Sequence, residues 1–514
     1  MNTVFRQVKN TLILNRYFIL LIIFYFVIRI ANLISFPIFN DEAIYLDWGW
    51  RETHVPGYLY YSLYDAKQPL LMWVFGVMEQ LLPDPLFAGR IISVFAGFLT
   101  LFGIYKIASK LFNTKVALLS ALTYTFVPLF SFYDRLALME SSISAIGIWA
   151  GYFLLNLFDR KYYKYAIFLG IIFGIGFFIK SSALVFLISF LVSLIYLIKL
   201  ASKKVKVLEI TILTLIVFLC SIVLLIINPQ FWETLHTNSR FTLTFSEFLS
   251  FPANIWISSF ITHFKISFFY LTPLLFITSL IGSFLIFKKT SKHKLFLLYF
   301  FISFLIANFS VRGGFDRYIV SFMPFLVICS SFILMEIFNK NKANGYFMII
   351  IFTLIPFILT MYQLINFPGY ILTMGKMSGY THPSYLSGFT SGYGINEAIE
   401  YFKNLSKKEK FVIGVAENTG NPESAFQIYF NKNKNAKTVY MDEKLLGVDL
   451  SKYDCLSTDV KVYFVSRDNQ QAGLEKFLEK VTEFKNPYGI NSIGVYQLKK
   501  NCKGKSLDIS ITKT

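Results

Sequence analysis

The stretch that decides the fold is Tyr17–Trp48, which reads YFILLIIFYFVIRIANLISFPIFNDEAIYLDW. Its first part, residues 17–36, is an apolar run of about 20 residues, the length that an α-helix needs to cross ~30 Å of hydrocarbon. Basic residues precede this run and no small-x-small cleavage site follows it, so we expect an uncleaved first membrane span. Two adjacent acidic residues, Asp41 and Glu42, follow shortly after the span.

The rest of the chain repeats this apolar character. Of 514 residues, 55% are hydrophobic and 18% are aromatic, and the mean hydropathy is +0.55. A soluble chain of this size is far less apolar, so we expect a membrane protein. The net charge of +19 would suit nucleic acid. The basic residues, however, stand in short gaps between apolar runs, where orientation in the bilayer explains them, so we expect no nucleic-acid partner.

Long apolar runs recur along the first 365 residues and predict about eleven helical spans. They lie near residues 17–36, 86–108, 116–133, 141–157, 165–180, 182–199, 208–227, 267–287, 294–310, 318–338 and 345–365. Lys and Arg gather in alternate connections, which is typical of cytoplasmic loops. We therefore predict a polytopic bundle in the plasma membrane, with a cytoplasmic N-terminus and an extracytoplasmic C-terminal region.

Three segments do not read as spans. Residues 37–85 and 228–266 are semi-polar and amphipathic, so we expect two outer loops within a transmembrane domain of residues 1–365. After about residue 366 the composition becomes polar, and residues 366–514 predict a small α/β domain. In it we expect helices at 394–405, 422–430 and 473–484 and strands at 411–417, 461–467 and 493–499.

The acidic pair Asp41 and Glu42 is the densest candidate for chemistry. Carboxylates close to a bilayer surface and an apolar bundle lose part of their hydration, which favours proton acceptance. Alternatively, the pair begins a short helix, where the helix dipole favours acidic residues, with Asn40 as the cap. Lys67, in the outer sequence KQPLLMW, would reach a lipid phosphate or simply extend to anionic headgroups.

Two further outer clusters carry charge. Asp134, Arg135 and Glu140 lie in FYDRLALMESS. The two acidic residues would stand about 240° apart on a continuous helix, so they cannot share one face without a turn between them. Arg312 and Arg317 flank a Gly pair, and a guanidinium presents a planar fork of donors that matches phosphate oxygens. Local charge balance and structural anchoring are the alternatives.

Other polar residues within apolar surroundings predict less. Arg29 would cost ~2.5–3.5 kcal/mol at the bilayer centre, so we expect it to face the bundle or to extend outward. Cys220 and Cys329 fall in apolar stretches, whereas Cys455 and Cys502 lie in the C-terminal region and would form a disulfide in an oxidising compartment. No His or Cys cluster has metal-ligand spacing, so we assign no metal.

Five short segments, taken together, resemble the integral-membrane glycosyltransferases of the GT-C fold. The resemblance is to the branch that contains the protein O-mannosyltransferases and the lipid A aminoarabinose transferases, and it covers most of residues 1–365. The segments are NDEAIY from Asn40, KQPLLMW from Lys67, YDRLALMES from Tyr133, GIGFFIKSS around Lys180 and DRYIVSFMP from Asp316.

The resemblance implies a function. It implies that a sugar moves from a polyprenyl-phosphate donor to an acceptor hydroxyl on a protein, lipid or glycan, with inversion, on the outer face of the membrane. Asp41 would be the general base beside Glu42, and the donor phosphate would be bound by basic residues. The implied phosphate-binding residues are Lys67, Arg135 and Arg317, and the supporting acidic residues are Asp134 and Glu140.

Two positions depart from the family pattern. Gln68 replaces the first Pro of a KPPL-like segment, and Ala66 stands where aminoarabinose transferases often carry an acidic residue. The second departure, Ala66, argues against aminoarabinose transfer and its associated metal site, although a divalent cation stays an open alternative. A lipid-linked sugar flippase or transporter without transferase activity is the alternative function. It would place ionisable residues near the midplane in repeated halves, and the sequence shows no repeat.

Overall fold

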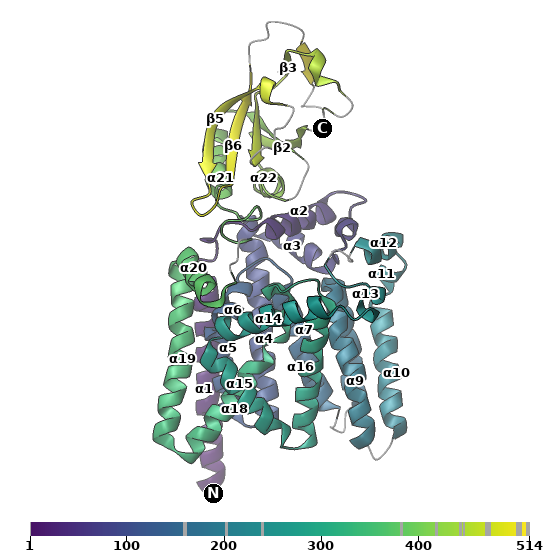
Figure 1. The fold of residues 1–514 in the computed structure, drawn as a ribbon, viewed down its shortest axis with the longest axis vertical. Coiled ribbons are helices and arrows are strands. Elements are labelled where there is room, and N and C mark those ends of the chain that lie inside the picture. Colours follow the sequence, from purple (N-terminus) through teal and green to yellow (C-terminus); the bar gives the residue numbers. More distant parts are fainter. Residues whose placement is uncertain are drawn as a thin grey trace. The chain divides into compact units, whose positions relative to one another are not determined.

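The computed structural model describes residues 2–157, 162–200, 204–237, 241–380, 384–416, 420–441, 445, 448–467, 474–499 and 506–509. These residues are mainly helical, and strands occur in the C-terminal part, which confirms the predicted fold class (Figure 1). The chain forms two compact units. The bundle unit contains Met1–Leu33, Tyr60–Leu71 and Arg90–Thr381, and the mixed unit contains Ile34–Leu59, Met72–Gly89 and His382–Thr514.

The bundle unit is built from helices and short 3₁₀ turns. Its long helices lie roughly side by side in Figure 1. The helices of the bundle unit, long and short, are α1 (Asn2–Ile30), α4 (Pro85–Leu111, shared with the mixed unit at its start), α5 (Thr114–Phe126), α6 (Pro128–Tyr133), α7 (Glu140–Asn156), α8 (Tyr162–Ile179), α9 (Leu184–Leu200), α10 (Lys204–Ser221), α11 (Val223–Ile226), α12 (Pro229–Thr237), α13 (Phe245–Leu249), α14 (Ala253–Tyr270), α15 (Pro273–Phe287), α16 (Ser291–Ser310), α17 (Asp316–Ile319), α18 (Phe325–Lys340), α19 (Lys342–Ile365) and α20 (Phe367–Ser378), with 3₁₀ turns η1 (Tyr61–Asp65), η2 (Ser181–Ala183) and η4 (Val320–Phe322).

Several of these helices are long and apolar enough to cross a membrane. Among the described residues, 5 qualify by length and composition, or up to 7 if two bent pairs each count as one span. The bent pairs are α14 with α15, at 109°, and α17–η4 with α18, at 54°. Other apolar runs of the sequence form helices that are interrupted or carry charge. The run 116–133, for example, divides before Pro128, whose ring cannot continue a helix interior.

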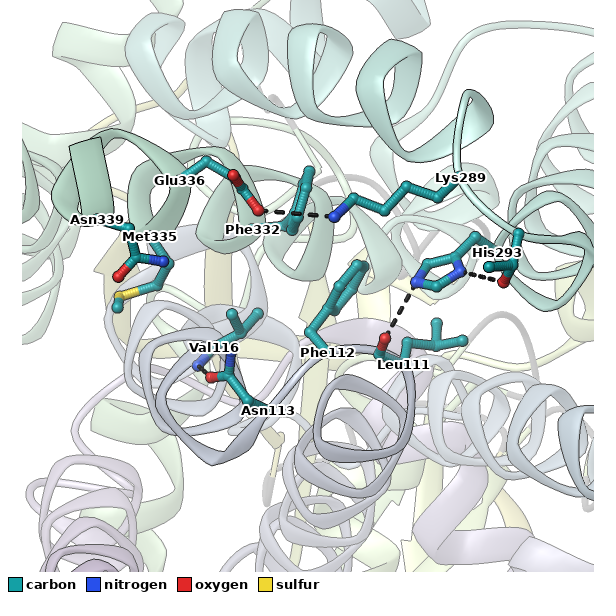
Figure 2. Close-up of a pocket in the computed structure, with 11 residues that line it drawn as sticks. Leu111, Phe112, Asn113, Val116, Lys289, His293, Phe332, Met335, Glu336 and Asn339 are labelled. Carbon is teal, nitrogen blue, oxygen red and sulfur yellow. Dashed lines mark hydrogen bonds and ion pairs between the residues drawn. The ribbon is translucent and has the colours of Figure 1, made fainter.

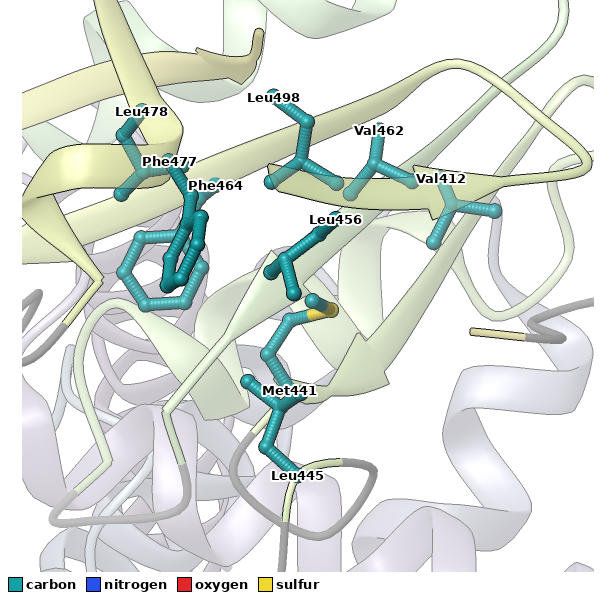
Figure 3. Close-up of a cluster of buried hydrophobic side chains, with 9 residues drawn as sticks. All are labelled: Val412, Met441, Leu445, Leu456, Val462, Phe464, Phe477, Leu478 and Leu498. Carbon is teal, nitrogen blue, oxygen red and sulfur yellow. The ribbon is translucent and has the colours of Figure 1, made fainter. Parts of the chain in front are cut away.

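The mixed unit contains a five-stranded sheet with strand order β2-β1-β4-β6-β5. The neighbours β2 (Ala436–Tyr440), β1 (Phe411–Val415) and β4 (Val462–Arg467) run parallel, whereas β6 (Ser492–Leu498) is antiparallel to both β4 and β5 (Leu478–Lys485). Buried apolar side chains on one side of the sheet pack together (Figure 3). Short β3 (Cys455–Thr458) and β7 (Ser506–Ile509) pair separately.

Most of the predicted elements of the C-terminal region are confirmed. The expected helices at 394–405 and 422–430 are α21 (Ile395–Ser406) and α22 (Glu423–Phe430), and the three expected strands are β1, β4 and β6. The helix predicted at 473–484 is wrong, because the chain forms a 3₁₀ turn (Glu475–Phe477) and then β5. Its LEKVTEFK segment pairs with β6 along its length, with one shift of register between Lys480 and Thr482, so tertiary pairing overrides the local helical pattern.

The described cysteines differ in their bonding state. Cys455 is disulfide-bonded, and Cys220 and Cys329 are free. Cys502 lies outside the described residues.

Candidate functional site

The acidic pair lies at the start of α2 (Asn40–His54) in the mixed unit, and its two carboxylates differ in setting. The Glu42 side chain is fully buried, and its Oε2 accepts a hydrogen bond from the Phe39 backbone N–H at 3.0 Å. Glu42 therefore stabilises the helix N-terminus, where unpaired N–H groups need acceptors. Asp41 is half-buried. Of the two, Asp41 is the carboxylate that stays accessible to a reactant.

The first turn of α2 is tied to the C-terminal region by hydrogen bonds. Asn40 was the expected cap, but Phe39 is the N-cap residue, and the Asn40 Oδ1 accepts from the Asn421 backbone N–H at 2.8 Å. The Asn421 Nδ2 donates in turn to the Ile38 carbonyl at 3.2 Å. Gly420 makes this approach feasible, since a Cβ there would lie 2.6 Å from an Ile44 side-chain carbon. The acidic pair and the C-terminal region thus belong to one folded unit.

Two further contacts hold the rest of α2. The Ser424 hydroxyl of α22 donates to Asp47 Oδ2 at 3.3 Å, and the Arg51 guanidinium donates to Asp47 Oδ1 at 3.1 Å and to the Tyr440 hydroxyl at 2.5 Å. Because these contacts lie six and ten residues beyond Asp41 on the same helix, they fix the direction in which α2 presents Asp41.

Helix α3 (Leu70–Leu81) packs closely on the opposite side of α2. A Cβ on Gly76 would lie 2.0 Å from the Gly49 carbonyl oxygen, so only glycine allows this backbone approach. Glu79 of α3 is buried, and burial raises its pKa well above the ordinary value of 4.5, with the Asp47 charge adding to the rise. Burial also raises the pKa of Asp47, although Arg51 opposes this shift. Two buried carboxylates, Asp47 of α2 itself and Glu79 of α3, therefore lie in the same unit as Asp41.

Lys67 lies in the bundle unit directly after a strained residue. Ala66 has φ +57°, a left-handed conformation that costs a non-glycine residue of order 1–2 kcal/mol. The Lys67 ammonium is 3.6 Å from Asp65 Oδ2 and 5.2 Å from the centre of the Phe241 ring. Its side chain is 21% exposed. The neighbouring Gln68 is buried with its Oε1 unpaired. Backbone strain of this kind is concentrated at functional sites.

Asp134 lies at the centre of a buried polar cluster in the bundle. Its carboxylate accepts from Arg29 Nε at 3.0 Å, from the Tyr25 and Tyr124 hydroxyls at 3.3 and 3.1 Å, and from the Ser141 hydroxyl at 2.9 Å. Arg29 and Asp134 are both almost completely buried. The expectation that Arg29 faces the bundle is therefore confirmed, and Asp134 is its buried counter-ion.

Arg135 is engaged with the end of α1. Its guanidinium donates to the carbonyls of Ile28, Arg29, Ala31 and Asn32 at 2.7–3.0 Å. The last carbonyls of a helix have no partner within the helix, and a cation at this end also opposes the negative end of the dipole. These contacts give Arg135 a structural role at the end of α1.

Glu140 brings together two cations that are distant in sequence. Its Oε1 accepts from Lys180 Nζ at 3.0 Å and from Arg317 Nε at 3.1 Å, across 40 and 177 positions. Glu140 is 1% exposed, while the side chains of Lys180 and Arg317 are 28% and 21% exposed. Burial alone would raise the pKa of Glu140, but the charges of Arg317 and Lys180 hold it at about 2. The three groups carry a net charge of about +1 at neutral pH.

The structure thus separates residues that are neighbours in sequence. A break after α6 lets Asp134 turn inward to Arg29 while Glu140 turns to Arg317, so the two acidic residues do serve different places. Arg312 pairs instead with Glu247 of α13. The sequence shows Lys180 as one of few basic residues in the outer connections and as part of a family-like motif, but no local pattern predicts its pairing with Glu140. In the described part of the chain, no three His, Cys, Asp or Glu side chains group as metal ligands.

Comparisons with known proteins agree with this architecture. The family model for dolichyl-phosphate-mannose-protein mannosyltransferase matches residues 66–227. No curated protein sequence matches the chain. The crystal structure of ArnT from Cupriavidus metallidurans bound to undecaprenyl phosphate is similar, with a TM-score of 0.58 and 12% identity over 93% of this chain and 97% of that one.

Two further structures are similar at the level of the fold. The apo form of the same ArnT gives a TM-score of 0.56 at 13% identity, covering 95% of this chain and 98% of that chain. The Archaeoglobus fulgidus oligosaccharyltransferase, tethered to an acceptor peptide, gives 0.50 at 13% identity, covering 88% and 69%. The chain therefore has the GT-C fold of membrane glycosyltransferases, and the resemblance seen in its motifs is confirmed.

Proposed function

We propose that this multi-pass membrane protein is a glycosyltransferase that moves a sugar from a polyprenyl-phosphate donor to an acceptor hydroxyl on the outer face of the membrane. The observation that carries the proposal is the pair of partly exposed cations, Lys180 and Arg317, held by the buried Glu140. A net positive site of this kind suits a phosphate, since guanidinium and ammonium groups donate charge-assisted hydrogen bonds to its oxygens. The ArnT structure with undecaprenyl phosphate supports a lipid phosphate as the ligand class.

The reaction is a single displacement. The acceptor oxygen attacks the anomeric carbon, the bond from that carbon to the phosphate oxygen breaks, and the configuration inverts. Asp41 accepts the acceptor's hydroxyl proton, a contribution of typically 10²–10⁴-fold. Negative charge grows on the departing polyprenyl phosphate, and Lys67, Arg317 and Lys180 stabilise it.

The distribution of roles follows from the contacts of each residue. Asp41 is the base rather than Glu42, because Glu42 is buried and engaged with the Phe39 N–H. Arg317 and Lys67 keep part of their side chains exposed, whereas most of the donors of Arg135 are directed to the end of α1. Arg135 therefore supports the site by holding α1.

Donor binding is tested on the purified full-length protein with undecaprenyl phosphate. Arg317→Gln should weaken binding by about 10-fold or more, since a hydrogen bond to a charged group contributes about 1.5–3 kcal/mol. Glu140→Gln is the matched control, because it removes the competing carboxylate and leaves both cations. It should bind the lipid phosphate at least as tightly as the natural protein. Equal weakening by both variants would show that the effect is structural.

Catalysis is tested with a panel of labelled polyprenyl-phosphate sugars and membrane extracts as acceptors. Asp41→Asn should lose transfer while keeping undecaprenyl phosphate binding. Glu42→Gln should lower the melting temperature, yet turnover per folded molecule should stay near the natural value. Transfer that survives in Asp41→Asn would remove this residue from the mechanism. Donor movement across vesicle membranes without any transfer would favour the flippase.

A further inference from the structure

An apolar groove runs along the bundle surface between α1, α5, α18 and α19. Its volume is about 850 Å³. On α5 the lining residues Lys115, Leu118, Leu119 and Leu122 follow the i, i+3, i+4, i+7 spacing of one helix face. The lining of α1 extends from Tyr17 to Val27, and that of the C-terminal helices includes Met335, Phe338, Tyr346 and Ile349.

One end of the groove is polar and the other is apolar. At the polar end lie Lys115, in the first turn of α5, and the phenol rings of Tyr17 and Tyr346. At the far end the rings of Phe24, Phe126 and Phe357 pack together, with centroids 5.0–6.3 Å apart. From Tyr17 to Val27, α1 rises about 15 Å, which is half the ~30 Å hydrocarbon thickness. The groove therefore has the depth of one leaflet.

The charge at the polar end is positive. Arg16 precedes Tyr17 directly, Lys342 lies one turn before Tyr346, and both are exposed like Lys115. Among the described residues that line the groove, none is acidic. Basic residues gather here because this is the predicted cytoplasmic end of the bundle.

A neighbouring pocket of about 490 Å³ holds a carboxylate that is paired with a cation of its own. Glu336, which follows the groove residue Met335, lines that pocket and pairs with Lys289 at 3.6 Å (Figure 2). His293 in the same pocket is engaged at both ring nitrogens, with the Thr290 hydroxyl and the Leu111 carbonyl. The pocket is thus internally paired, whereas the groove presents Lys115 beside an apolar channel.

We propose that the groove binds an anionic glycerophospholipid of the cytoplasmic leaflet, with an acyl chain between α1, α5 and α19 and its phosphate at Lys115. An empty channel would deprive its lining of contacts, and an acyl chain restores them. Basic pockets between membrane helices on the cytoplasmic side are suited to anionic headgroups. A polyprenyl phosphate shares this chemistry, but the lining of α1 extends over only about 15 Å, the depth of a single leaflet.

Binding is measured on delipidated full-length protein by native mass spectrometry and thermal unfolding, with dioleoylphosphatidylglycerol and dioleoylphosphatidylcholine. The anionic lipid should bind more tightly and raise the melting temperature more. Lys115→Gln should weaken its binding about fivefold, the effect of one interfacial cation. The matched control is Lys164→Gln, which changes an exposed lysine of α8 that lies over the Phe168 ring, away from the groove, and it should bind normally.

The apolar channel is tested separately by Leu122→Trp, which fills it. This variant should lose phosphatidylglycerol binding while its melting temperature without lipid stays at or above that of the natural protein. The proposal is overturned if both lipids bind equally, or if Lys164→Gln weakens binding as much as Lys115→Gln. The proposal is also overturned if undecaprenyl phosphate displaces phosphatidylglycerol from the natural protein and displaces it less well from Lys115→Gln. That result would assign the groove to the polyprenyl phosphate.

Discussion

The buried pair of Arg29 and Asp134 gives the sharpest stability prediction. Asp134→Asn keeps the size of the side chain but leaves the Arg29 charge buried without its counter-ion. Breaking one partner of a buried pair costs about 3–5 kcal/mol. Arg29 retains the Thr125 and Tyr124 carbonyls, at 2.9 and 3.4 Å, so we expect the lower end of this range. At about 2.1 cal/mol/K of unfolding entropy per residue, a chain of 514 residues shifts by about 1 °C per kcal/mol, so the melting temperature should fall by about 3 °C.

The assay is thermal unfolding of the purified protein in detergent, with a double-mutant cycle. Arg29→Gln alone should also destabilise the protein, and the double variant Arg29→Gln with Asp134→Asn should lose less than the sum of the singles. Glu336→Gln is the control, since its half-exposed pair with Lys289 should be worth less than about 1 kcal/mol. If Asp134→Asn melts like this control yet loses transfer, Asp134 acts in the chemistry and the structural reasoning is refuted.

Three further outcomes are expected. Arg135→Lys should lower the free energy of unfolding by about 1.5–3 kcal/mol, seen as a lower melting temperature. The reason is that an ammonium cannot donate to all the α1 carbonyls that the guanidinium reaches. Tyr440→Phe should cost about 0.5–1.5 kcal/mol through the lost Arg51 contact, measured as earlier unfolding in denaturant. Because the pKa of Glu79 is raised in the folded protein, the protonated side chain stabilises the fold. This contribution to the free energy of unfolding is complete below the ordinary pKa of 4.5 and is lost as pH rises through the raised pKa of the folded state. Glu79→Gln should therefore flatten the decline of melting temperature with rising pH, and an unchanged pH profile would contradict this.

Sequence patterns located many of the candidate groups but not their partners. Asp41 and Glu42 were visible as one acidic pair, yet only the folded chain distinguishes the buried, capping Glu42 from the half-buried Asp41. Arg135 read as a phosphate ligand because it follows an acidic residue in a family-like motif. Its engagement with the carbonyls of α1 depends on a contact across more than 100 positions, which no local pattern encodes.

The amino-acid sequence by itself determined the membrane class, the helical bundle and most elements of the C-terminal domain, because hydrophobic run length and periodicity are local properties. The β5 strand was decided by its pairing with β6 rather than by its own helix-like residues. Tertiary structure alone also decided that Glu140 gathers Lys180 and Arg317, and that α2 folds with the C-terminal region. These outcomes depend on which charges can be buried together, since a carboxylate leaves water only where distant cations or donors meet it.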